Sequence, residues 1–190
     1  MNIKAAIDTL RLFNEKADKL EGLSFTKSLG KSGVTISYKL GQPVQVERHG
    51  PDDESIDAFV LTMRFFVQNN EATSFKNMAD LYTELPVDAE LKNKFNDARA
   101  KTNAGLDKKT PIKLNGVDLT WRGIYEIFLW GGLAHANQEK KAVYDSWAKD
   151  PFSFRLLQNE FVFAMGIILN MIFYTRAVNK AALGQLEAKP

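Results

Sequence analysis

Apolar residues recur at steps of three and four near the start of the chain, in the series Ile3, Ile7, Leu10, Phe13, Ala17 and Leu20. This spacing places them on one face of an α-helix, so residues 3–20 are predicted to form an amphipathic helix. The pattern changes to alternation of apolar and polar residues over 34–39 and again over 44–47. Alternation predicts strands, and Gly41-Gln42-Pro43 between them predicts a tight turn.

Helical spacing returns after Pro51. Residues 52–54 are acidic and suit the first turn of a helix, and apolar stripes predict helices over 56–67, 74–85, 88–101, 121–130, 138–149 and 152–183. In the last of these, apolar residues cover most of the circumference, so we expect its middle turns to be surrounded by other helices. Residues 102–110 are polar and predict a loop. Asn115-Gly116, flanked by Leu114 and Val117, predicts a β-hairpin.

These elements predict a mainly α (α+β) protein: a helical bundle with a small antiparallel β-sheet or hairpin near the N-terminus. A chain of 190 residues is the usual size of one domain. Within a single domain 1–190 we expect an N-terminal helix at 1–21, a β segment at 22–50 and a helical bundle at 51–185. Two or three strands are marginal alone, so the sheet is expected to pack on helices.

Composition favours a soluble protein. Apolar residues make up 45% of the chain, which allows a large core, and a charged fraction of 25% argues against global disorder. The net charge of +2 argues against a protein that coats nucleic acid. No cysteine is present, which excludes disulfides and cysteine-based zinc sites. The most apolar segment, 161–174, is shorter than the roughly 20 residues of a membrane span. We expect a cytoplasmic protein without a membrane partner.

Motifs for nucleotide and metal binding are weak. Gly30-Lys31-Ser32 matches the end of a phosphate-binding loop, but position 25 is Phe where that motif requires glycine, and a strand follows. A hairpin turn is the better interpretation. His49 beside the acidic residues 52–54 offers metal ligands, although acidic residues also stabilise a helix N-terminus. We therefore predict neither a cofactor nor a metal ion.

Aromatic and basic residues mix on both sides of the second histidine, His135: Trp121, Arg122, Lys140, Lys141 and Trp147. Such groups can stack on bases and contact phosphates. The helical spacing of Trp121, Tyr125, Phe128 and Leu129 equally places them in a core, and this interpretation is favoured.

His135 itself follows Gly131-Gly132 in the stretch FLWGGLAHAN and lies between two predicted helices. The glycine pair permits a sharp bend or a close helix crossing. Histidine at such a junction can hydrogen bond to free backbone groups at helix ends. It can also act as a general acid or base near neutral pH. Both hypotheses stay open.

The segment LTWRGIYEIFLWGGLAHANQEKKAVYDSW, with its aromatic-Gly-x-x-Ala-His-x-Asn core, resembles a set of uncharacterised bacterial and archaeal helical proteins. More distantly, the chain resembles the HEPN superfamily of helical bundles, many of which are metal-independent RNases with an arginine shortly before a histidine. Residues 129–134 contain no arginine; Arg122 lies upstream and Arg155 downstream of His135. The resemblance implies candidate catalytic residues His135, Asn137, Arg122 and Arg155, with RNA as the substrate.

Three functions follow from this sequence. The first is a non-enzymatic helical protein that acts through a protein partner or a homodimer, within a stress or defence system. The second is the RNase centred on His135. The third is a bundle that binds an apolar small molecule among its phenylalanines, which requires an enclosed cavity. The first is favoured.

Overall fold

The computed structural model describes residues 1–21, 25–29, 32–37, 45–49, 56–133 and 136–188, and the side chains of residues 1–21, 61–133 and 136–188. The protein is mainly α with small antiparallel sheets. Its helices are α1 (Ile3–Leu20), α2 (Ile56–Val67), α3 (Phe75–Glu84), α4 (Ala89–Leu106), α5 (Trp121–Glu126), α6 (Gln138–Trp147) and α7 (Pro151–Glu187). A π-helical segment, η1 (Ile127–Leu133), follows α5 directly.

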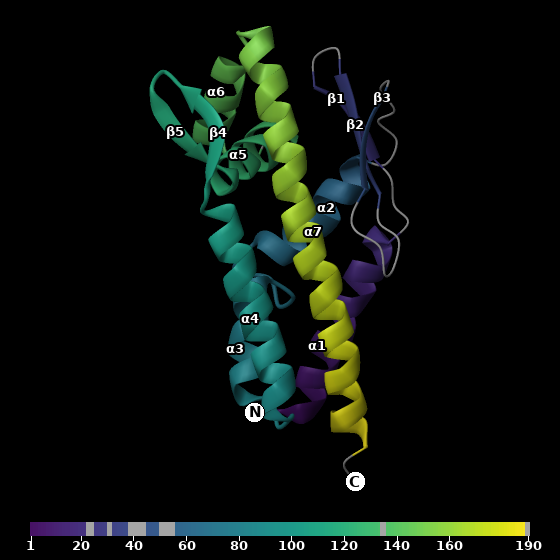
Figure 1. The fold of residues 1–190 in the computed structure, drawn as a ribbon. Coiled ribbons are helices and arrows are strands. Elements are labelled where there is room, and N and C mark those ends of the chain that lie inside the picture. The colour runs from purple at the N-terminus through teal and green to yellow at the C-terminus, as the bar shows by residue number, and fades with distance from the viewer. Residues whose placement is uncertain (22–24, 30–31, 38–44, 50–55, 134–135, 189–190) are drawn as a thin grey trace.

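Helix α7 runs the length of the molecule and packs against α1, α4 and α5 (Figure 1). Its core residues include Leu157, Phe161, Met165, Ile168 and Ile172, all of which are buried. Apolar side chains of the other helices close around this row. The hydrophobic core is therefore built along one central helix.

The buried residues of α7 do not cover its whole circumference. Phe163 and Tyr174 are exposed, so the prediction that the middle of this helix is surrounded is wrong for one face. Among the described residues, α7 alone is long and apolar enough to cross a membrane, and 61% of its most apolar window is buried inside the structure. A helix of this kind is typical of a protein core as well as of a membrane span.

Polar side chains cap the helices where the sequence changes pattern. Ser74 accepts a hydrogen bond from the backbone N–H of Asn77 and begins α3, and Thr120 accepts one from Gly123 and begins α5. Asp88 and Asp150 cap α4 and α7 in the same manner. Each cap satisfies a donor that the first helical turn leaves free.

The described residues form two antiparallel sheets. The strands β1 (Phe25–Leu29), β2 (Ser32–Ser37) and β3 (Gln45–His49) pair in the order β1-β2-β3, and β4 (Lys109–Leu114) pairs with β5 (Val117–Thr120). The predicted fold class placed the small sheet or hairpin near the N-terminus, whereas the two-stranded hairpin lies at 109–120, where Asn115-Gly116 predicts its turn. Its turn has positive φ angles at Asn115 (51°) and Gly116 (78°). This turn geometry suits the twist of paired strands, and the Asn-Gly pair that favours it explains why the hairpin forms at 109–120.

Two further element predictions are corrected. Residues 102–110 are not a loop, because α4 continues to Leu106 and β4 begins at Lys109. Leu106 is buried in the core, and this contact extends the helix beyond its polar stretch. The helix that begins at Trp121 changes to π geometry at Ile127 instead of remaining α-helical to Trp130.

Candidate functional site

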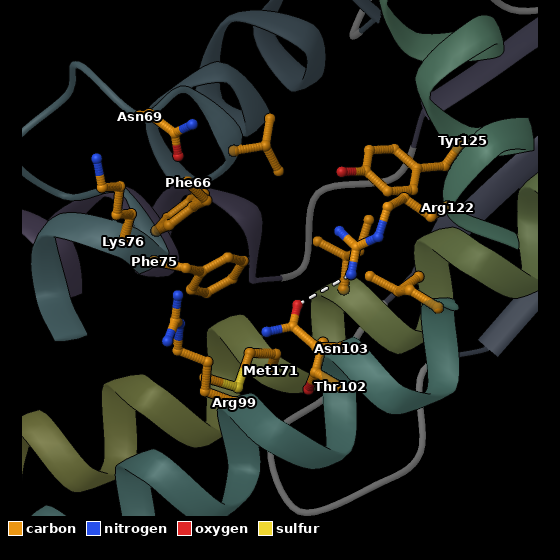
Figure 2. A pocket seen from close by; sticks show the side chains of 13 residues that line it. Phe66, Asn69, Phe75, Lys76, Arg99, Thr102, Asn103, Arg122, Tyr125 and Met171 are labelled. Atoms are coloured by element: carbon orange, nitrogen blue, oxygen red, sulfur yellow. Dashed lines mark hydrogen bonds between the residues drawn. The ribbon is translucent and has the colours of Figure 1, made fainter. Parts of the chain in front are cut away.

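A cavity of about 180 Å³ lies where α4, α5 and α7 meet the end of α2 and the start of α3 (Figure 2). Its walls come from segments that are far apart in the sequence. The lining residues are Phe66, Val67, Asn69, Phe75, Lys76, Arg99, Thr102, Asn103, Leu106, Arg122, Tyr125, Ile168 and Met171. The cavity is open to solvent on one side, where Asn69 and Lys76 are exposed.

Positive charge dominates the polar part of the wall. Lys76 comes from α3, Arg99 from α4 and Arg122 from α5, and no aspartate or glutamate is among the described residues that line the cavity. In the described part of the chain, Lys76 and Arg99 have no carboxylate within 4.0 Å, whereas Arg122 has one. Figure 2 shows Lys76 and Arg99 on either side of Phe75, with Arg122 at the opposite end.

Arg122 is held in a fixed orientation. Its Nε donates to Oδ1 of Asp107 at 2.5 Å, and its Nη2 donates to Oδ1 of Asn103 at 3.1 Å. Asp107 caps the C-terminus of α4, one turn after Asn103. The hydrogen bond from Arg122 lowers the pKa of Asp107, so this carboxyl stays ionised at neutral pH.

The inner wall is apolar. Phe66 and Ile168 are fully enclosed, Met171 is nearly so, and Phe75 is partly buried. Tyr125 adds one polar group at the end near Arg122, and burial raises the pKa of its hydroxyl to about 12. The phenol therefore remains neutral and can donate or accept a hydrogen bond. The cavity joins an apolar wall to a cationic rim.

The stretch around His135 has a different character. Residues 134 and 135 lie outside the described part of the chain, so the role of His135 stays a prediction. Asn137 begins α6 and accepts a hydrogen bond from the backbone N–H of Lys140 at 3.0 Å. This is a capping contact. Asn137 does not line the cavity.

The glycine pair before His135 allows two segments to touch. A Cβ atom on Gly131 would lie 2.5 Å from the carbonyl oxygen of Lys140, and one on Gly132 would overlap the ring of Tyr144. The expected close crossing is thus present between η1 and α6. Only glycine permits this approach without a shift of backbone or ring.

The two candidate arginines lie in different surroundings. Arg122 faces the cavity, while Arg155 has an exposed side chain near the start of α7 and is not one of the lining residues. Of the four residues that the RNase hypothesis names, Arg122 alone borders this cavity among those the structure describes. RNA cleavage by His135 with these residues stays a prediction.

The mixed aromatic and basic cluster is occupied by packing and ion pairs. Trp121 donates to Glu160 at 2.6 Å and packs on Phe163, and Trp147 lies 6.2 Å from Phe128 between ring centres. The two lysines of this cluster form ion pairs, Lys140 with Glu126 and Lys141 with Asp145. These contacts favour the core interpretation of Trp121, and Trp147 also packs against the core.

Metal binding has no support in the described part of the chain, where no three His, Asp or Glu side chains gather as ligands. The side chain of His49 and residues 52–54 fall outside that part. The prediction of no metal ion is therefore not tested at those residues.

Sequence reasoning missed most of the cavity. Arg99, Thr102, Asn103 and Leu106 follow the i, i+3, i+4, i+7 spacing of one helix face. On that face, polar residues replace the apolar ones expected toward a core. This interruption is the one local signal for a site, and it does not reveal that Lys76 or Tyr125 lies opposite.

Comparison with known proteins adds no functional information: the chain matches no protein-family model, no curated protein and no solved structure.

Proposed function

We propose that this protein is a non-enzymatic helical binding protein, and that the cavity between α3, α4 and α5 holds a small organic anion with an apolar body. The observation that carries this proposal is the pair of cations beside Phe75. Lys76 and Arg99 have no carboxylate partner in the described part of the chain, and they border an apolar wall.

The charge pattern supports an acidic ligand. Arg99 is half-buried, and a guanidinium that loses water without gaining a partner is disfavoured. A carboxylate or phosphate would restore that interaction, and charge-assisted hydrogen bonds to arginine are among the strongest in proteins. Elsewhere, the buried Arg176 has two carboxylate partners within the chain. Among the described residues, Lys76 and Arg99 lack such partners, which favours binding of an external anion at their end of the cavity.

The volume and the lining of the cavity restrict the apolar part of the ligand. Sites for drug-sized ligands occupy roughly 300–1,000 Å³. A cavity of about 180 Å³ is smaller and suits a molecule with a single ring. Phe66, Phe75 and Met171 would contact that ring, since aromatic and thioether side chains favour such contacts.

A charged probe and its neutral analogue test this function. We expect 4-methylbenzoate to bind with saturation, as measured by calorimetry and by shifts of cavity resonances in NMR spectra. The uncharged 4-methylbenzamide should bind about tenfold more weakly or not at all, because it lacks the anion. Absence of saturable binding by 4-methylbenzoate, phenyl phosphate and inorganic phosphate would overturn the proposal.

Substitutions locate the site. Arg99→Gln removes one cation from the wall and should weaken 4-methylbenzoate binding about tenfold. Lys101→Gln is the control, because Lys101 lies on the same helix with an exposed side chain and does not line the cavity. Equal affinities in both variants would show that the probe binds elsewhere.

A second candidate function, self-association or binding of a protein partner, rests on the exposed face of α7. Phe152 is 74% exposed and Phe163 is 54% exposed, with Leu156 on the same helix. Exposed apolar side chains that gather on one surface mark interaction sites. Sedimentation velocity over a range of concentrations tests for a homodimer. A single monomer species at all concentrations would exclude the homodimer, and a parent dimer that persists in Phe152→Ser would place the contact elsewhere.

A further inference from the structure

Asp107 neutralises one end of the cavity without forming its wall. Its side chain is 59% exposed and holds Arg122 from the solvent side. It does not appear among the residues that line the cavity. Arg122, in contrast, extends into the cavity beside Tyr125 and Asn103 (Figure 2). One carboxylate of the chain thus balances one of the three cations at the site.

The remaining positive charge is concentrated at the other end. Lys76 and Arg99 lie there, beside Phe75. At the Arg122 end, a ligand would meet the Asn103 amide nitrogen and the neutral hydroxyl of Tyr125, which itself interacts with Arg122. The two ends therefore differ: one attracts an anion and the other offers uncharged hydrogen-bonding groups.

We propose that Asp107 is a specificity-determining residue that makes the cavity select ligands with a single acidic group. This inference rests on the proposed function. The acidic group binds at Lys76 and Arg99, and the far end of the ligand meets Asn103 and Tyr125. A second acidic group at the far end is disfavoured, because Asp107 already occupies Arg122 and repels another negative charge.

The test compares two ligands that share one ring. One is 4-methylbenzoate, with a single carboxylate, and the other is terephthalate, with carboxylates at both ends. Their dissociation constants are measured by calorimetry for the parent protein and for Asp107→Asn. In the parent, 4-methylbenzoate should bind more tightly. Asp107→Asn frees Arg122 from its counter-charge, so the affinity ratio should shift toward terephthalate by about tenfold.

A matched variant controls for net charge. Asp97 lies on α4, is exposed and does not line the cavity. Asp97→Asn therefore changes the net charge by the same amount as Asp107→Asn and should leave the affinity ratio unchanged. Thermal unfolding of each variant checks that the fold is kept.

One outcome overturns the inference while the proposed function stands: an affinity ratio in Asp107→Asn that equals the ratio in the parent. If both affinities also fall by the same factor, Asp107 only positions Arg122. Failure of both ligands to bind the parent protein would instead contradict the proposed function itself.

Discussion

Gly132 lies directly against the aromatic ring of Tyr144, and a Cβ atom at position 132 would overlap that ring. The contact joins η1 to α6 and also places Tyr144 edge-on to Phe128, with 5.3 Å between ring centres. Packing of α6 on the core therefore depends on the absence of a side chain at one position.

Gly132→Ala should lower the free energy of unfolding by about 1–3 kcal/mol, because an added methyl group forces neighbours to move. For a chain of this size, the thermal midpoint falls by roughly 2–4 °C per kcal/mol. Gly166→Ala is the control, since a Cβ there meets no atom of the described residues within 4 Å. Alanine favours helix, so this control should unfold at the same temperature or higher. Similar losses in both variants would contradict the packing argument.

The glycines of the helical segments differ in what surrounds them. The described residues leave open space around the Cβ position of Gly166 in α7. The close approach occurs at Gly131 and Gly132 instead. A glycine in a helical pattern therefore does not show by itself which contact it permits.

A buried chain of hydrogen bonds links three helices. The hydroxyl of Tyr82 donates to Asn179 at 2.6 Å, and the Asn179 amide donates to Asn14 at 3.2 Å. Tyr82→Phe leaves the Asn179 oxygen without its donor in a dry core, so the free energy of unfolding should fall by about 1–2 kcal/mol. Tyr144→Phe is the control, because the Tyr144 hydroxyl makes no hydrogen bond within the described residues. Denaturant titration of both variants measures the difference, and equal losses would contradict a role for the chain of bonds.

Local chemistry and long-range packing differ in how far the sequence reveals them. Thr120 and the Asn115-Gly116 turn were predictable, because a cap or a turn depends on residues within a few positions. The cavity depends on side chains as far apart as Phe66 and Met171, which one helix period cannot relate. Arg122 was named as a candidate from its chemistry, but its partner Asp107 was not, since that pairing requires the α4 and α5 arrangement.

Stability should fall in alkaline solution because tyrosines are buried neutral. Burial raises the pKa of Tyr144 to about 12, whereas a tyrosine in the unfolded chain has a pKa of about 10. Its contribution is fully present below about pH 10 and is lost as the pH rises toward about 12, because the unfolded chain releases the proton first. Tyr144→Phe should match the parent at neutral pH and lose less stability above about pH 10, by at most about 1.4 kcal/mol per pH unit. If the free energy of unfolding falls in parallel for the parent and Tyr144→Phe above about pH 10, Tyr144 does not contribute to the alkaline loss of stability.

Arg176 connects α7 to α1 through a buried charge. It is 1% exposed, and its Nη1 lies 2.6 Å from Oδ1 of Asp18 and 2.6 Å from Oε2 of Glu21. The guanidinium is enclosed, while Asp18 is 55% exposed and can be solvated. Loss of the two carboxylates should therefore be more harmful than loss of the cation.

The double variant Asp18→Asn with Glu21→Gln leaves the buried guanidinium without a counter-charge and should lower the free energy of unfolding by roughly 3 kcal/mol or more. Arg176→Met should cost less, because methionine fills the space and water solvates the freed carboxylates. Glu15→Gln, which breaks an exposed pair with Lys19, is the control and should leave the midpoint unchanged. Urea unfolding ranks the three proteins. If Arg176→Met is the least stable, the carboxylates do not compensate the buried charge, and the packing of the arginine stem stabilises the contact between the two helices instead.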